Sequence, residues 1–171
     1  MKRIGKIVLL VVITFLVFKM TASAQWTTMD LSYKEGFEEA KNVVVHAPEY
    51  AEYSESGINK TLGAWIYAHH FNGEPVFVFN FYDLNSGSDL EYSGESKITI
   101  SSSSGEYYSC EFEGLILQGV EAERFNKFIL QNEKEMKVEI KQSLSKGTER
   151  KLEFTISSSG LEDQLWFNSA S

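Results

Sequence analysis

The chain has 171 residues, of which 43% are hydrophobic and 13% aromatic, with only two prolines. This composition excludes a largely disordered protein and suits one domain with a substantial core. Acidic residues (24) outnumber basic ones (16), and no basic patch with interleaved aromatics occurs, which excludes nucleic acid as a partner.

The first 24 residues have the three parts of a secretory signal peptide. The start is positively charged, an apolar run extends from Ile7 to Phe18, and small residues precede Gln25. The apolar run is shorter than the roughly 20 residues that span a bilayer. We therefore expect cleavage before Gln25, one globular domain over residues 25–171, and export to the periplasm or the extracellular space.

Cleavage would change the charge balance of the chain. Four basic residues and no acidic ones lie in the first 24 positions, so 12 basic residues would remain against 24 acidic ones, a formal charge of −12. No second long apolar run follows, so we expect that the mature protein is not an integral membrane protein.

The mature chain begins with its least readable part. Residues 37–47 combine a possible short helix with a short strand at 43–45, whereas the acidic segment 48–57 is typical of a loop. From Leu62 onward the sequence alternates in twos, which predicts half-buried antiparallel strands. The predicted strands are 62–70, 75–82, 96–101, 106–112, 135–143 and 150–157.

Turn signals separate these strands. Asn72-Gly73 predicts a hairpin, residues 83–95 read as a loop, and short turns are expected at 101–105 and 143–148. The strand at 75–82 is apolar on both faces, which places it centrally. The outward faces of the last two strands carry opposite charges, which favours pairing between them.

The period changes to that of a helix between Val120 and Asn132. Ala122, Phe125, Phe128 and Ile129 form one apolar stripe, and charged residues occupy the other side. We expect the helix to end at Asn132, because asparagine tolerates a left-handed backbone. The tail from Gly160 to Phe167 is expected to form a helical turn that docks Leu161, Leu165 and Trp166.

Few residues could take part in catalysis or ligand binding through their chemistry, and we expect no catalytic residue, no metal and no cofactor. Cys110, the only cysteine, shares a strand face with two aromatics and is best explained by packing, with an intermolecular disulfide and catalysis as alternatives. The neighbouring His69 and His70 point to opposite faces of a strand, so they do not form a metal site. Tyr107 and Glu111, on the other face of the cysteine strand, are the residues that a partner would touch.

The aromatic residues around the first predicted hairpin are the candidate ligand-binding residues, with an ordinary β-protein core as the alternative. They are Trp65, Tyr67, Phe77 and Phe79. The stretch GAWIYA, with Gly63 and Trp65, resembles the G-x-W motif of lipocalins. This resemblance implies a small β-barrel that holds a small apolar ligand, with Trp65 closing its floor.

The C-terminal half has a second resemblance, which covers roughly Lys97 to Phe167. The segments ITISSSSGEYYSCEF, FNKFILQN, MKVEI and LEFTISSSGLEDQLWF resemble the invasion-associated locus B family of exported bacterial proteins. The resemblance implies an immunoglobulin-like β-sandwich at the cell envelope. It places Gly160 and Leu161 at the start of a closing helical turn, and it matches Trp26 to a tryptophan near the family's mature N-terminus. The family commonly has paired cysteines, and this chain has one.

Together these features predict a mainly β domain, an antiparallel immunoglobulin-like β-sandwich with one amphipathic helix, or alternatively a small lipocalin-like β-barrel. We expect an exported, non-enzymatic binding or interaction protein of a bacterial envelope. Two alternatives remain: a carrier of a small apolar ligand, and a hydrolase that uses a pair of carboxylates.

Overall fold

The structure is a computed structural model that describes seven segments of the chain. They are residues 25–29, 43–48, 50–71, 73–90, 94–132, 135–144 and 147–161. The predicted signal peptide, residues 37–42 of the segment expected to hold a short helix, and Leu165 and Trp166 of the expected closing turn lie outside these residues.

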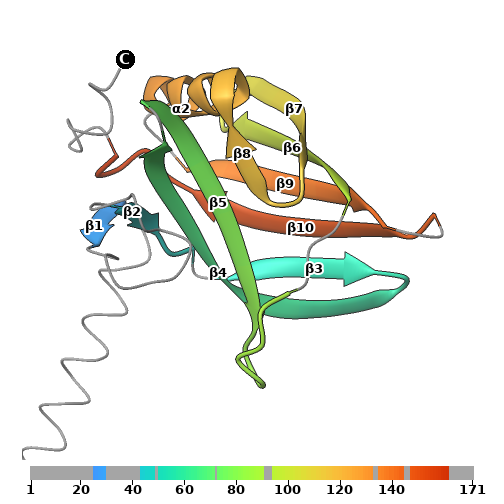
Figure 1. The fold of residues 1–171 in the computed structure, drawn as a ribbon. Coiled ribbons are helices and arrows are strands. Elements are labelled where there is room, and N and C mark those ends of the chain that lie inside the picture. The colour runs from blue at the N-terminus through green and yellow to red at the C-terminus, as the bar shows by residue number, and fades with distance from the viewer. Residues whose placement is uncertain are drawn as a thin grey trace, which may run out of the picture.

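Ten strands and one helix make up the regular structure of the described residues (Figure 1). The strands are β1 (Thr27–Met29), β2 (Val43–His46), β3 (Ala51–Glu55), β4 (Ile58–Phe71), β5 (Glu74–Asp83), β6 (Glu95–Ser102), β7 (Tyr107–Glu113), β8 (Ile116–Gln118), β9 (Met136–Ser143) and β10 (Glu149–Ile156). The helix, α2, spans Gly119–Gln131.

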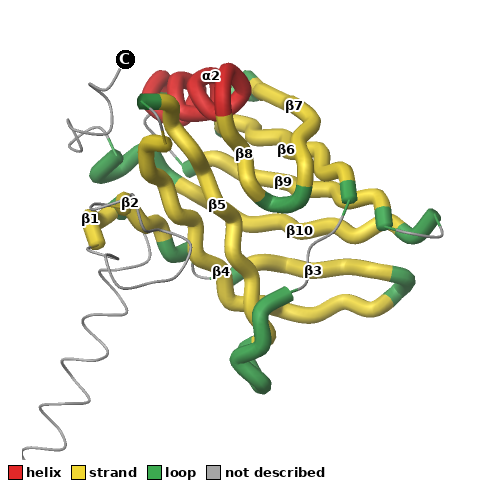
Figure 2. The backbone as a smooth tube through the Cα atoms, viewed as in Figure 1, coloured by secondary structure: helices red, strands yellow, loops and turns green. Residues whose placement is uncertain are grey.

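The strands form one antiparallel sheet that nearly closes into a barrel. The sheet runs β1-β2-β4-β3-β10-β9-β6-β7, and β5 joins β4 to β8. A short turn connects β7, at one end of the sheet, to β8, which pairs with β5. The two ends of the sheet therefore come together beneath α2 (Figure 2). The arrangement therefore fits the predicted barrel alternative and is not clearly the sandwich that we placed first.

The reason for this curvature lies in β4. This strand of 14 residues pairs with β3 through residues 58–62 and with β5 through residues 62–71. The partner on one edge changes from β3 to β2 near Gly63, so the sheet curls around this strand instead of dividing into two layers. Nothing in the two-residue alternation encodes this change of partner.

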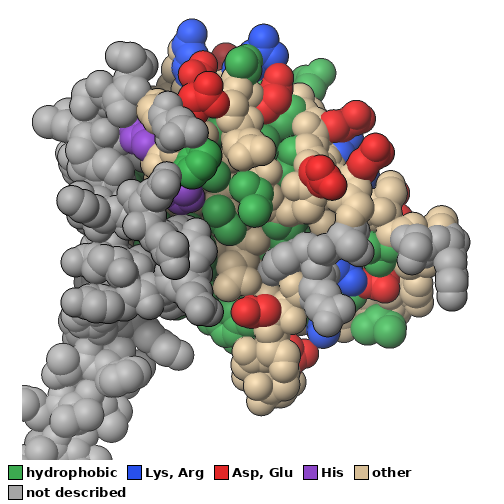
Figure 3. Space-filling model, viewed as in Figure 1, with side chains coloured by type: hydrophobic (Ala, Val, Ile, Leu, Met, Phe, Trp, Pro, Cys, Tyr) green, Lys and Arg blue, Asp and Glu red, His purple; other side chains and the backbone are tan. Residues whose placement is uncertain are grey.

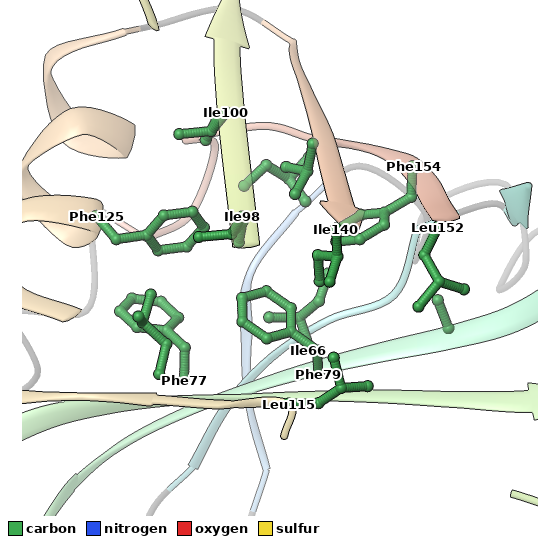
Figure 4. Close-up of a cluster of buried hydrophobic side chains, with 14 of the residues drawn as sticks. Ile66, Phe77, Phe79, Ile98, Ile100, Leu115, Phe125, Ile140, Leu152 and Phe154 are labelled. Atoms are coloured by element: carbon green, nitrogen blue, oxygen red, sulfur yellow. The ribbon is translucent and has the colours of Figure 1, made fainter. Parts of the chain in front are cut away.

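The barrel interior is filled with side chains. Ile66, Phe77 and Phe79 from β4 and β5 meet Ile98, Ile140 and Phe154 from the opposite wall, and all of them are almost fully buried (Figure 4). At one end Phe125 of α2 makes edge-on contacts with Phe77 and Phe79, at ring-centroid distances of 5.1 and 5.9 Å. The helix thus acts as a plug for the barrel.

The helix prediction is confirmed to within a residue at each end. Ala122, Phe125 and Ile129 are buried, as the stripe predicted, and Phe128 is half-buried. The expected left-handed residue is wrong, because Asn132 has an extended backbone with φ −118°. Its side-chain Nδ2 instead donates to the Phe128 carbonyl at 2.8 Å, which satisfies one of the free carbonyls of the last turn.

The loop expected at 48–57 is also wrong. Its second half is the strand β3, in which Ala51 and Tyr53 are buried and Glu52 is exposed. A tight turn at Ser56 and Gly57 then leads into β4. The alternation was present in the sequence, but the acidic residues on the exposed face made the segment resemble a loop.

The outward charges of β9 and β10 pair diagonally. Directly opposite positions hold like charges, Lys151 against Lys141 and Glu153 against Glu139. Lys151 Nζ instead lies 2.9 Å from Glu139 and 3.0 Å from Glu153, and Lys137 pairs with Glu153. These half-exposed ion pairs each contribute a fraction of a kcal/mol, about 0.2–1.

Candidate binding groove at the seam of the barrel

The sheet is incomplete where β7 and β8 diverge, and a groove of about 660 Å³ lies there. We call it the seam groove. The described residues that line it are Val78, Phe79, Gly94, all eight residues from Glu111 to Gln118, and Glu121. In the space-filling view, acidic and hydrophobic side chains lie next to one another over β7 and β8 (Figure 3).

The corner at Gly114 and Leu115 creates this groove by changing the partner of the chain. The Gly114 N–H donates to the Gly94 carbonyl at 3.0 Å, on the β6 side. One residue later, the Leu115 carbonyl accepts from the Phe79 N–H at 3.0 Å, on the β5 side. β7 runs alongside β6, whereas β8 runs alongside β5. The two strands therefore separate beyond the corner.

A buried polar network fixes the position of the corner. Ser96 Oγ donates to the Gly114 carbonyl, and Gln142 Nε2 donates to Ser96 Oγ at 2.9 Å and lies 3.4 Å from the same carbonyl. Ser96 and Gln142 are both buried. Buried polar groups are retained when every member finds a partner, so this network holds the closed end of the groove in place.

The opposite end of the groove is bridged between β7 and α2. The Tyr108 hydroxyl donates to the Glu121 carboxylate and lies 3.1 Å from the Glu121 carbonyl. Arg124 Nη1 contacts the same carboxylate at 3.0 Å. Burial, followed by hydrogen bonds to Cys110 and Glu121, raises the pKa of Tyr108, so the phenol stays protonated and can donate.

Cys110 lies on the inward face of β7, between Tyr108 and Phe112, where it packs against the core. The thiol is half-buried and unpaired, and burial raises its pKa. A nucleophilic cysteine needs a lowered pKa, so this environment does not activate the thiol. The packing interpretation therefore describes its surroundings better than catalysis does.

The groove has an apolar floor and an acidic rim. The rings of Phe79 and Phe112 lie 6.2 Å apart at its base. Glu111 and Glu113 are exposed at its edge, and Ile116 keeps 50% of its surface exposed on the β8 side. Every ionisable side chain among the described lining residues is a glutamate. Such a surface can bind a group that is both apolar and positively charged.

The structure does not bring the four predicted ligand-binding residues together. Phe77 and Phe79 point into the barrel and are fully buried. Trp65 and Tyr67 point to the opposite face of the same sheet, where they form a separate cluster with Val43, Val45 and Val78. Of the four, only Phe79 lines the seam groove.

The position of Trp65 also bears on the lipocalin-like expectation. Trp65 is not part of the barrel core, because it packs on the outer cluster. A Cβ atom at Gly63 would lie 2.1 Å from the ring of Tyr82, its cross-strand neighbour. The glycine of GAWIYA thus leaves room for the Tyr82 ring that lies across it, and this packing explains the glycine without a ligand.

Sequence reasoning identified part of the groove and missed the rest. Tyr107 and Glu111 were expected to face a partner, and Tyr107 is 73% exposed while Glu111 lines the rim. Phe112, Ile116 and Glu121 were not singled out. Their convergence depends on the corner at Gly114, and a Gly-Leu pair within an alternating stretch is only a weak signal of it.

The described histidines do not form a metal site. Among the residues that the structure describes, no three His, Cys, Asp or Glu side chains lie close enough to hold a metal ion. His46 is buried against the Trp26 ring at 5.1 Å, and desolvation lowers its pKa to about 4. The imidazole is therefore neutral at pH 7.

A second depression, of about 350 Å³, lies over β3 and the first half of β4. Its lining is polar and includes Glu52, Lys60 and Thr61. Lys60 and Arg150 both lie over the Tyr53 ring, at 5.1 and 5.7 Å from its centroid. These cations are engaged in holding β3 to its neighbours, so the seam groove is the better candidate site.

Comparisons with protein-family models, with curated proteins and with solved structures gave no significant match. The resemblances to lipocalins and to the invasion-associated locus B family therefore stay predictions. None of the helices in the described segments is long and apolar enough to cross a membrane.

Proposed function

We propose that this chain is an exported, non-enzymatic binding protein of a bacterial envelope, and that it takes a protein partner at the seam groove. The observation that carries the proposal is the groove itself, with an apolar base at Phe79 and Phe112 and an acidic rim. It lies along the edge of β7 with which no described strand pairs, where a partner can reach both side chains and backbone.

Two further observations support binding over catalysis. The described lining contains no histidine, cysteine, serine or lysine, so glutamates are its only candidate bases and nucleophiles; Glu111 and Glu113 lie exposed on the rim, and Glu121 is bound to Tyr108 and Arg124. The apolar groups exposed there, Ile116 and half-buried Phe112, gain by being covered, at roughly 25 cal/mol per Å² of buried apolar surface.

Site-specific photocrosslinking in cells tests the site. A photoreactive residue at Ile116 should crosslink to one defined protein, because this side chain is exposed within the groove. The matched control is a photoreactive residue at Thr155, which is exposed on β10 away from the groove. The same products from both positions, or none from Ile116, would count against the proposal.

Export has its own test. The mature protein recovered from the periplasm or the medium should begin at Gln25, as N-terminal sequencing would show. An intact N-terminus on protein that remains in the cytoplasm would contradict export.

The nearly closed barrel also favours a second function, a carrier of a small apolar ligand, as the lipocalin-like resemblance implies. Against it stands the packed interior, in which Ile66, Phe77 and Phe79 are all fully buried. A ligand that binds only the folded state would raise the melting temperature by mass action. We expect a panel of lipophilic ligands to leave the melting temperature unchanged, and a rise of several degrees would favour the carrier.

A further inference from the structure

We propose that the occupant of the seam groove is an extended, basic segment of the partner protein, which adds as a strand to the free edge of β7. This inference rests on the proposed function and names the chemistry of its partner. Three independent features carry it: the unprotected edge of β7, a cluster of like charges beside it, and the apolar base of the groove.

The edge of β7 lacks the usual protection of an exposed strand. Among the described strands, β7 ends the path of the sheet and pairs with β6 alone. Exposed edges are commonly blunted by lysine, by proline or by shortness. The sequence YYSCEFE has seven residues and neither of those residue types. Its outer edge therefore presents N–H and C=O groups to which an incoming strand can bond.

Like charges gather on the outer face of β6 and β7. Glu113 stands directly opposite Glu95, and Glu111 stands two residues further along the same face. Like charges directly opposite each other destabilise a sheet. Lys97, opposite Glu111, offsets part of this charge, and Arg124 pairs with Glu121. Among the described residues, Glu95 and Glu113 form no ion pair, and a lysine or arginine from a partner would neutralise them.

The same charges disfavour a second copy of this chain as the occupant. Pairing β7 with another β7 would bring Glu111 and Glu113 of the two copies close together. The acidic edge therefore disfavours pairing with a second copy of this chain and favours a basic strand. Repulsion as well as attraction thus contributes to specificity.

Alternation along an added strand matches the two faces of the groove. Side chains that point inward would meet half-buried Phe112, which packs on Phe79 beneath it, and those that point outward would meet Glu111 and Glu113. The expected segment therefore alternates apolar residues with lysine or arginine. It is short, because the corner at Gly114 closes one end and the bridge from Tyr108 to Glu121 closes the other.

The test uses a synthetic nine-residue peptide in which lysine alternates with valine and phenylalanine, added to the mature protein. We expect saturable binding, with new protection from hydrogen exchange at β7 amides between Ser109 and Glu113. Two control peptides should not bind: one with proline at its centre, which cannot complete the backbone pairing, and one with glutamate in place of every lysine.

Protein variants distinguish the effect of charge at the groove from the effect of the net charge of the protein. E111K/E113K should weaken binding of the lysine peptide at least tenfold. The matched control is E106K/E123K, which makes the same change in net charge at exposed sites that do not line the groove, and it should bind as the parent does. A circular dichroism spectrum identical to that of the parent would show that each variant is folded.

The outcomes are distinguishable. Equal loss in both variants would overturn the inference, because it would mean that only net charge matters. Equal binding of the proline peptide, or protection outside β7, would overturn strand addition. If no peptide binds while Ile116 still crosslinks to a defined protein, the inference fails and the proposed function stands. If the crosslink is absent as well, both fail.

Discussion

Single residues at the termini of the described domain fix its closing contact. Trp26 Nε1 donates to the Ser157 carbonyl at 2.7 Å, and the Trp26 N–H donates to the Ser159 carbonyl at 2.9 Å. Gly160 follows with φ +83°, and a Cβ there would lie 2.6 Å from the Trp26 carbonyl oxygen. The bond to Ser157 needs the indole of Trp26, and the close approach of the Trp26 backbone explains the glycine at position 160.

Replacing Gly160 by alanine should therefore destabilise the protein strongly. The variant combines a left-handed backbone, at about 1–2 kcal/mol, with a backbone clash of about 1–3 kcal/mol. Gly87→Ala is the control, since Gly87 has a φ of +69° but open space around its Cβ position. Urea denaturation should show the larger loss for Gly160→Ala, and equal losses would remove the contact with Trp26 from the explanation.

His46 predicts how stability depends on pH. Its pKa is about 4 in the folded protein and near 6.5 in the unfolded chain. Between these values the unfolded chain binds more protons, so the free energy of unfolding falls as the pH falls. The loss attributable to His46 is about 3 kcal/mol between pH 6.5 and pH 4.

The variant His46→Gln isolates that contribution. Burial also lowers the pKa values of His69 and His70, so a smaller loss in the same direction should remain in the variant. Urea denaturation at a series of pH values measures both proteins. An unchanged pH dependence in His46→Gln would contradict the buried, neutral histidine.

At the scale of the elements, three fully buried side chains hold α2 to the barrel, and Phe125 is the largest of them beside Ala122 and Ile129. Phe125 is fully buried and contacts the rings of Phe77, Phe79 and Tyr108. Phe128 is half-buried, with its ring 6.4 Å from that of Tyr108. The helix therefore owes its place to a stripe that the sequence revealed, and to aromatic partners that only the fold supplied.

Truncation of Phe125 should cost about 3–5 kcal/mol, because the cavity left in the barrel cannot collapse fully. Phe128→Ala is the matched control and should cost clearly less. Equal losses in the free energy of unfolding, measured by chemical denaturation, would mean that α2 docks through its outer edge and not through Phe125.

At the scale of the whole molecule, the strands of the barrel differ in whether they are paired on both sides or on one. β9 is paired on both sides, with β6 and β10, whereas β7 is paired on one side. Amides that lack a partner strand open and exchange more readily than those in the middle of a sheet.

Hydrogen exchange of the free protein should show this difference directly. We expect slow exchange along β9, and fast exchange at those β7 amides that point away from β6. β7 amides as slow as those of β9 would mean that the barrel is closed at the seam, and would remove the free edge on which strand addition depends.

The sequence by itself determined the mainly β class, most strand positions, the helix to within a residue at each end and the inward direction of Cys110. These features are local, because the alternation of apolar residues reports which face of a strand is buried. Tertiary structure decided what lies between segments: the curl around β4, the separation of Trp65 and Tyr67 from Phe77 and Phe79, and the groove. A periodic pattern specifies which face of a strand is buried but not which segment packs against that face. The corner at Gly114, where the chain changes partner from β6 to β5, could be found only in the folded protein.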